Sequence, residues 1–158
     1  MSNFFEKSLQ KEFDFSDSPS ATVKHNLKNA LSFDDFLARN NDHMLDQSLS
    51  EYLNSLLKQK GLRRPDVIKD ADLDKGYVHQ IFNGDKNPSR NKLLSLAFGM
   101  HLNEEETQRM LKLAGHSELY ARVTRDALIL FAIQRGMSLS DTDKALYAKG
   151  LPTLRSPE

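Results

Sequence analysis

The chain of 158 residues is predicted to be all-α, and three features of its sequence support this fold class. Apolar residues recur three and four positions apart in several segments, as on the buried face of an amphipathic helix. Residues that favour helix ends separate these segments, with Ser, Asp or Asn before them and Gly after them. No segment shows the strict alternation of apolar and polar residues that is typical of a half-buried strand. We therefore expect helices joined by short turns and no sheet.

The N-terminal part of the chain divides into two segments. Residues 1–31 are polar and weakly periodic, which predicts a flexible segment or one that folds onto a protein partner. Residues 32–47 are predicted to hold a short accessory helix. Ser32 can cap that helix, and Phe33 and Phe36 would share one of its faces.

Residues 48–103 are predicted to form the main domain, which begins with four short helices. The first, over residues 48–60, has the strongest amphipathic pattern, and turn or cap residues separate each helix from the next. The residues that set these ends are Gly61, Pro65, Asp74, Asn83-Gly84-Asp85 and Asn87-Pro88.

Residues 104–158 are predicted to form a helical extension, because the sequence from Arg90 onward repeats itself. A shift of 35 positions superposes Arg90 on Arg125 and Gly115 on Gly150. Each copy consists of a helix, a tight turn, a second helix and a glycine stop, and the second helices are predicted to be capped by Asn103 and Ser138. Two stacked hairpins would bury both apolar faces, so we expect the extension to be continuous with the main domain. Further matches are Leu93/Leu128, Ala97/Ala132, Thr107/Thr142, Leu111/Leu146 and Leu119/Leu154.

The charged residues are distributed unevenly, although 22 basic and 22 acidic side chains give a formal net charge of zero. Residues 1–47 carry 5 basic and 8 acidic side chains, a net charge of −3, and residues 48–103 carry 9 and 6, a net charge of +3. Residues 104–158 carry 8 of each. The small basic excess therefore coincides with the main domain, where it favours nucleic-acid binding.

The segment from Leu62 to Leu102 resembles the Xre/Cro-like (lambda-repressor-type) helix-turn-helix family of bacterial transcriptional regulators. Its most specific element is the turn Gly84-x-x-Asn87-Pro88-Ser89 after the third helix. The other matching residues are Leu62, Val67-Ile68, Ala71, Leu73, Tyr77-Val78, Gln80-Ile81 and Leu93 through Ala97. The resemblance implies a five-helix lambda-repressor-like domain followed by a stacked helical hairpin repeat. Arg125-Asp126-Ala127 and Gly150-Leu151-Pro152 in that repeat are similar to extended members of the family.

The resemblance implies sequence-specific binding of double-stranded DNA and a role in transcription regulation. The third helix, over residues 74–83, would enter the major groove, and flanking residues would hold the phosphates. The implied base-reading residues are Lys75, Gly76, His79 and Gln80. The implied phosphate-binding residues are Arg64, Tyr77, Asn83, Lys86, Asn87 and Arg90.

Three residues depart from the family pattern. Asp72 stands where a turn glycine is usual, and Ile68 stands where a small alanine is usual. Phe82 replaces an exposed charged residue, which predicts an outward-facing apolar side chain that a partner or the N-terminal segment would cover. The alternative function is therefore a protein-interaction module that retains the helix-turn-helix shape without binding DNA.

Several classes of protein are not expected. The sequence has no cysteine, and its histidines lack the spacing of metal ligands, so we expect no disulfide and no metal site. It has no phosphate-binding loop after a strand and no nucleophile motif, so we expect neither an enzyme nor a cofactor. It has neither an apolar run of membrane-spanning length nor a secretory pattern, which predicts a cytoplasmic protein.

A homodimer through residues 120–154 is also expected. Leu128, Phe131 and Leu146 offer more apolar surface than one hairpin needs, and paired domains would bind an inverted repeat. The alternative is that the N-terminal helix with Phe33, Phe36 and Leu37 covers this surface within the chain.

Overall fold

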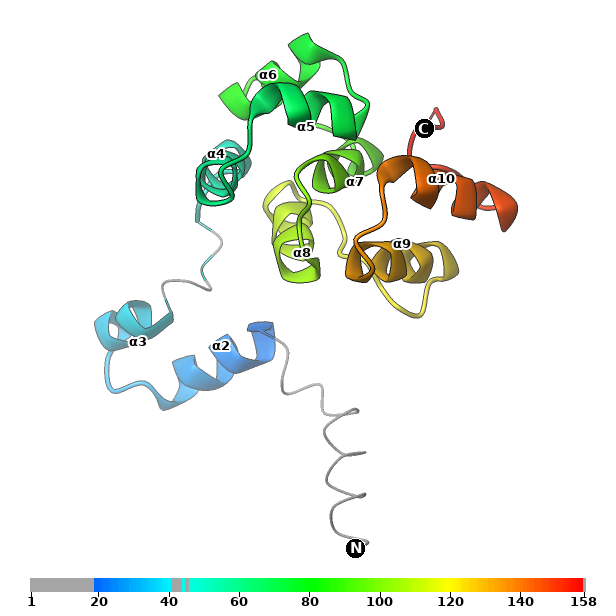
Figure 1. Ribbon diagram of the computed structural model, residues 1–158. Helices are drawn as coiled ribbons and strands as arrows, with labels where there is room; N and C mark the ends of the chain where they lie inside the picture. The colour runs from blue at the N-terminus through cyan, green and yellow to red at the C-terminus, as the bar shows by residue number, and fades with distance from the viewer. Residues whose placement is uncertain (1–18, 41–43, 45, 158) are drawn as a thin grey trace, which may run out of the picture. The chain divides into compact units, whose positions relative to one another are not determined.

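The computed structural model describes residues 19–40, 44 and 46–157, and over these residues it confirms the all-α class (Figure 1). They form nine α-helices and no strand. None of these helices is both long and apolar enough to cross a membrane. The chain divides into two compact units, Met1–Asp46 and Gln47–Glu158. The helices are α2 (Pro19–Asn29), α3 (Phe33–Asn40), α4 (Leu49–Gln59), α5 (Arg64–Ala71), α6 (Lys75–Asn83), α7 (Arg90–Gly99), α8 (Glu104–Leu113), α9 (Thr124–Gln134) and α10 (Leu139–Ala148).

The first unit contains α2 and α3, which pack against each other. As predicted, the Ser32 hydroxyl caps α3. The buried side chain of Asn40 joins the two helices, because its Oδ1 accepts a hydrogen bond of 2.8 Å from Asn26 and its Nδ2 donates one of 2.8 Å to the carbonyl of Phe36. The sequence did not predict α2, which has few apolar residues and no clear apolar face. Residues 1–18 of the predicted flexible segment lie outside the described residues.

In the second unit, most of the predicted helix ends are confirmed. Asp74 caps α6, and the Asn103 and Ser138 side chains cap α8 and α10, each by accepting a backbone N–H of the first turn. Helix α7 begins later than predicted. Its cap is Ser89, whose hydroxyl accepts the N–H of Lys92, so the Asn-Pro pair belongs to the preceding segment.

One apolar core extends through the second unit, from Leu53 in α4 to Leu154 after α10. Helix α7 lies near its centre, with α5 on one side and α10 on the other (Figure 1). Gly99 allows α5 and α7 to approach closely: a Cβ atom there would lie 2.6 Å from the Cβ of Ala71 and 2.8 Å from the carbonyl of Val67. The predicted extension and the main domain therefore share one compact body.

The repeat that was predicted from the sequence is also present in the contacts. We call α7–α8 the first hairpin and α9–α10 the second hairpin. Arg90 Nε donates a hydrogen bond of 3.0 Å to the carbonyl of Ser117, and Arg125 Nε donates one of 2.8 Å to the carbonyl of Pro152. Both donors and both acceptors are 35 positions apart, so each arginine fixes the segment that follows its own hairpin.

The two hairpins contact each other reciprocally. Arg90 of the first hairpin donates to both oxygens of Asp126 in the second, and Arg125 of the second donates to Oδ1 of Asn91 in the first. Asn91 and Asp126 are themselves 35 positions apart. In the same way, α7 packs on α10 and α8 on α9. Such reciprocity is typical of a two-fold interface between like surfaces, not of a translational stack.

Candidate nucleic-acid interface

A short turn separates α5 from α6 and sets where α6 begins. Asp72 adopts a left-handed conformation there, with φ 51° and ψ 44°. Glycine adopts this conformation most easily, which fits the turn glycine that is usual here in the family that the sequence resembles. Its carboxylate accepts a hydrogen bond of 3.1 Å from Arg155 Nη1. Hydrogen bonds to Asp143 and then to Asp72 raise the pKa of Arg155 above its ordinary value. The Asp74 side chain then accepts the N–H of Tyr77 and begins α6.

Helix α6 has two distinct faces. Its inner face consists of Val78, Ile81 and Phe82, which are buried in the core. The outer face carries polar or small residues, of which only His79 is half-buried. The four predicted base-reading residues therefore share one accessible face of a single helix. The outer-face residues are Lys75, Gly76, His79, Gln80 and Asn83.

The prediction that Phe82 faces outward is wrong, since only 2% of this residue is exposed. The Cζ atom of Arg64 lies 5.0 Å from the centre of the ring, and Asn54 Nδ2 donates a hydrogen bond of 2.8 Å to the carbonyl of Phe82. The guanidinium of Arg64 thus covers the Phe82 ring, and the charged group at this surface comes from Arg64 on α5. No exposed apolar side chain remains at this position of α6.

Arg64 also contacts a predicted base-reading residue. Its Nη1 lies 3.0 Å from Nδ1 of His79, and its Nη2 donates a hydrogen bond of 3.4 Å to Oδ1 of Asn54. Because a guanidinium only donates, Nδ1 is the acceptor and the proton of the neutral imidazole lies on Nε2. Arg64, at the start of α5, therefore fixes both the position and the tautomer of His79 on α6.

The predicted phosphate-binding residues differ in their surroundings. Lys86 and Asn87 are exposed in the segment before α7, and Asn83 is exposed at the end of α6. Tyr77 is half-buried and packs against the core. Arg90 uses four of its five N–H groups internally, two with Asp126 and two with backbone carbonyls. The contacts of Arg90 therefore support a structural role and not a phosphate contact.

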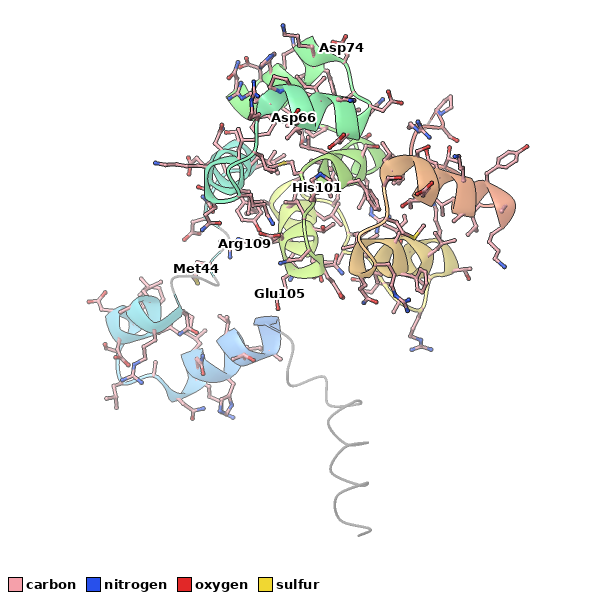
Figure 2. All side chains as sticks on the ribbon, viewed as in Figure 1. Met44, Asp66, Asp74, His101, Glu105 and Arg109 are labelled. Carbon is pink, nitrogen blue, oxygen red and sulfur yellow. The ribbon has the colours of Figure 1, made fainter. Side chains whose placement is uncertain are left out.

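Carboxylates stand among the cations of this region. Figure 2 shows Asp66 on α5 and Asp74 at the beginning of α6, and both are exposed, as is Asp85 after α6. Asp72 is paired with Arg155, and Asp70 lies 3.3 Å from Nε2 of His101. The electrostatic field around α6 is consequently mixed in sign.

Two residues that support this region were not predicted from the sequence. Asn54 joins α4 to Arg64 and to the end of α6, and Arg155 holds the turn before α6 from 83 positions further along the chain. No local pattern marks either residue, because each acts on a partner distant in sequence.

The surface predicted to form a dimer differs from the expectation at Leu146. Leu146 is fully buried because it lies on the inner face of the second hairpin. Leu128 is half-buried, and Phe131 is 48% exposed. The large apolar side chains that are exposed between residues 120 and 154 are Tyr120, Val123, Phe131 and Tyr147.

Among the described residues, no three His, Asp or Glu side chains lie close enough to hold a metal ion. Comparison with protein-family models, with curated proteins and with solved structures returned no match to this chain.

Proposed function

We propose that this protein binds double-stranded DNA sequence-specifically as a regulator of transcription, with α6 in the major groove, as in the Xre/Cro-like family that its sequence resembles. The observation that carries the proposal is the division of α6 into two faces. Every apolar residue of its inner face is buried, while Lys75, Gly76, Gln80 and Asn83 are exposed together. A helix with such an outer face fits the width of the major groove.

The base-reading residues differ in the chemistry they offer. Gln80 can form two hydrogen bonds with adenine, and Lys75 can donate to the acceptors of guanine. His79, with Nδ1 engaged by Arg64, presents Nε2–H and is therefore a donor to a base acceptor. Gly76 adds no side chain between Lys75 and Tyr77, which allows a close approach of the backbone.

The phosphate contacts are assigned to Lys86, Asn87 and Asn83, which are exposed beside α6. Arg64 joins them, since within the described residues three of its five N–H groups have no hydrogen-bond partner. The role assigned to Arg90 is different: it holds the first turn of α7 against the second hairpin.

A homodimer is part of the proposal, because one small domain seldom binds DNA tightly alone. Val123, just before α9, and Phe131, within α9, have exposed side chains that provide apolar surface for the dimer. Sedimentation of the full chain at micromolar concentration, with Phe131→Ser for comparison, tests this part. A monomer in both proteins, with and without DNA, would contradict it.

Binding of the full chain to random duplex DNA at low and at moderate salt tests the main proposal. Because phosphate contacts release counterions, we expect measurable binding at low salt and a steep loss as salt rises. The control is Lys149→Ala, which removes an exposed lysine from the end of α10. If duplex DNA is not bound even at low salt, α6 does not read DNA.

That negative result would favour the alternative of a protein-interaction module. One observation favours this alternative: Asp66, Asp74 and Asp85 are exposed around α6. Their carboxylates weaken the attraction between this surface and the phosphates of DNA.

A further inference from the structure

An open cleft lies beside α10, between that helix and the segment that follows it. Its volume is about 370 Å³, within the range of small-molecule sites. It lies outside the proposed DNA-contacting residues. The lining residues are Asp143, Lys144, Tyr147, Thr153, Arg155 and Ser156.

The internal repeat shows which features of the cleft are special to the second hairpin. In the first hairpin, Gln108 Oε1 accepts the N–H of Leu119 at 2.7 Å, and in the second, Asp143 Oδ1 accepts the N–H of Leu154 at 2.7 Å. These residues are again 35 positions apart. The backbone framework around the cleft is therefore common to both hairpins.

The side chains over this framework differ. In the first hairpin, Lys112 Nζ and Glu118 Oε1 form an ion pair of 2.9 Å. The equivalent positions of the second hairpin hold Tyr147 and Thr153, which form no such pair and instead line the open cleft. The cleft thus lies where the first hairpin has a salt bridge.

The charged groups of the cleft favour an anion. Two cationic side chains line it, those of Lys144 and Arg155. One carboxylate, that of Asp143, stands against these two cations in the lining, and it already accepts hydrogen bonds from the N–H groups of Leu154 and Arg155 and from Arg155 Nε. Within the described part of the chain, Nη2 of Arg155 donates no hydrogen bond to protein, and Arg155 is exposed. A bound anion could therefore accept from it.

The remaining wall of the cleft is aromatic. Tyr147 is 80% exposed, so its ring is available to a flat apolar group. We propose that the cleft binds a small organic anion, in which a phosphate or carboxylate group contacts Arg155 and Lys144 while a flat apolar group lies against Tyr147.

Binding at this site would act on the turn before α6, and this consequence rests on the DNA-binding function proposed above. Arg155 Nη1 lies 3.1 Å from Oδ2 of Asp72, the residue that holds the left-handed conformation between α5 and α6. An anion that accepts from Nη2 shares this guanidinium with Asp72 and weakens the attraction between Nη1 and the Asp72 carboxylate. The ligand thereby changes the position from which α6 reads DNA.

Titrations of the full chain without DNA test the site, using amide chemical shifts and three probes. Phenyl phosphate carries both features of the proposed ligand, inorganic phosphate carries only the charge, and benzyl alcohol carries only the ring. Phenyl phosphate is expected to bind about tenfold more tightly than either of the others, because both contacts contribute. Its shifts should centre on residues 153–156 and include Asp72.

Substitutions distinguish the cleft from the rest of the surface. Tyr147→Lys with Thr153→Glu reproduces the ion pair of the first hairpin and should weaken phenyl phosphate binding about tenfold. Lys144→Ala should also weaken it, whereas the matched control Lys149→Ala, at the C-cap of the same helix, should not. Equal affinity for phenyl phosphate and inorganic phosphate, or unchanged affinity of the double variant, would overturn the site.

The coupling to α6 has a separate readout. If phenyl phosphate binds but the amide of Asp72 does not respond, the coupling is wrong while the site stands. With DNA, phenyl phosphate should change the affinity of the wild-type chain and not that of the double variant. Absence of any DNA binding would count against the proposed function alone, because the titrations without DNA are independent of it.

Discussion

Arg90 and Asp126 form a bidentate ion pair between the first and second hairpins, with Nη1–Oδ1 and Nη2–Oδ2 distances of 3.2 and 3.0 Å. The Asp126 side chain is only 7% exposed. The same guanidinium also binds the carbonyls of Ser117 and Glu118. One side chain thus connects the start of α7, the segment that follows the first hairpin and the start of the second hairpin.

Arg90→Ala should lower the free energy of unfolding by about 3 kcal/mol, because it removes the cation paired with the buried carboxylate of Asp126 and leaves the N–H of Tyr120 as its donor. Urea unfolding of the full chain measures this loss. The control is Lys92→Ala on the same helix, which removes an exposed cation and should change stability little. Equal midpoints for the two variants would show that the ion pair does not join the hairpins.

Gly99→Ala should destabilise the second unit by about 2 kcal/mol, because the new methyl group would overlap Ala71 and the carbonyl of Val67. The matched substitution is Gly76→Ala, where the Cβ would meet only the flexible Asp74 side chain at 3.2 Å. That variant should be at least as stable as the wild type, as judged by thermal unfolding. A Gly99→Ala protein as stable as Gly76→Ala would contradict the close packing of α5 on α7.

Substitutions on α6 and beside it should affect DNA binding differently. Gln80→Ala should relax the preference at one base position, costing about 1–3 kcal/mol of discrimination. Lys86→Ala should weaken all duplexes about equally and flatten the dependence on salt. Affinities for a panel of single-base variants of a selected site measure both effects. Identical sequence profiles for the two variants would contradict the proposed docking of α6 in the major groove.

Stability at alkaline pH should depend on Tyr52. Burial, followed by the charge of Glu106, raises the pKa of Tyr52 from 10.0 to about 12, although nearby Arg109 opposes the shift. Between pH 10 and 12 the unfolded chain therefore releases a proton that the folded chain retains, so this contribution to stability is lost as pH rises through that range. Urea midpoints from pH 9 upward should fall less steeply for Tyr52→Phe than for the wild type. Parallel curves would show that the phenol titrates normally.

Much of the fold could be predicted from local sequence. Apolar spacing located α4 to α10, and cap residues such as Asp74 and Asn103 act where they were expected, because a helix end depends on its immediate neighbours. The 35-residue repeat correctly paired Arg90 with Arg125. Such patterns depend on short-range geometry, which the sequence expresses directly.

The features that could not be predicted are contacts between residues that are distant in sequence. Phe82 was expected to face outward because no local signal shows that Arg64 covers its ring. The ion pair of Arg90 was not predicted either, because its partner Asp126 lies 36 positions away. Periodicity identifies which residues share a face of a helix, but it does not identify which distant side chain meets a polar group.

The reciprocal contacts of Arg90 and Arg125 limit how this architecture can grow by duplication. In a solenoid, each new repeat leaves a fresh surface for the next, so arrays lengthen easily. Here the contact surface of each hairpin is buried against the other hairpin. A third copy would therefore have no equivalent surface to bind. The two hairpins therefore form a closed pair, and additional copies of this unit would have to attach through a different surface.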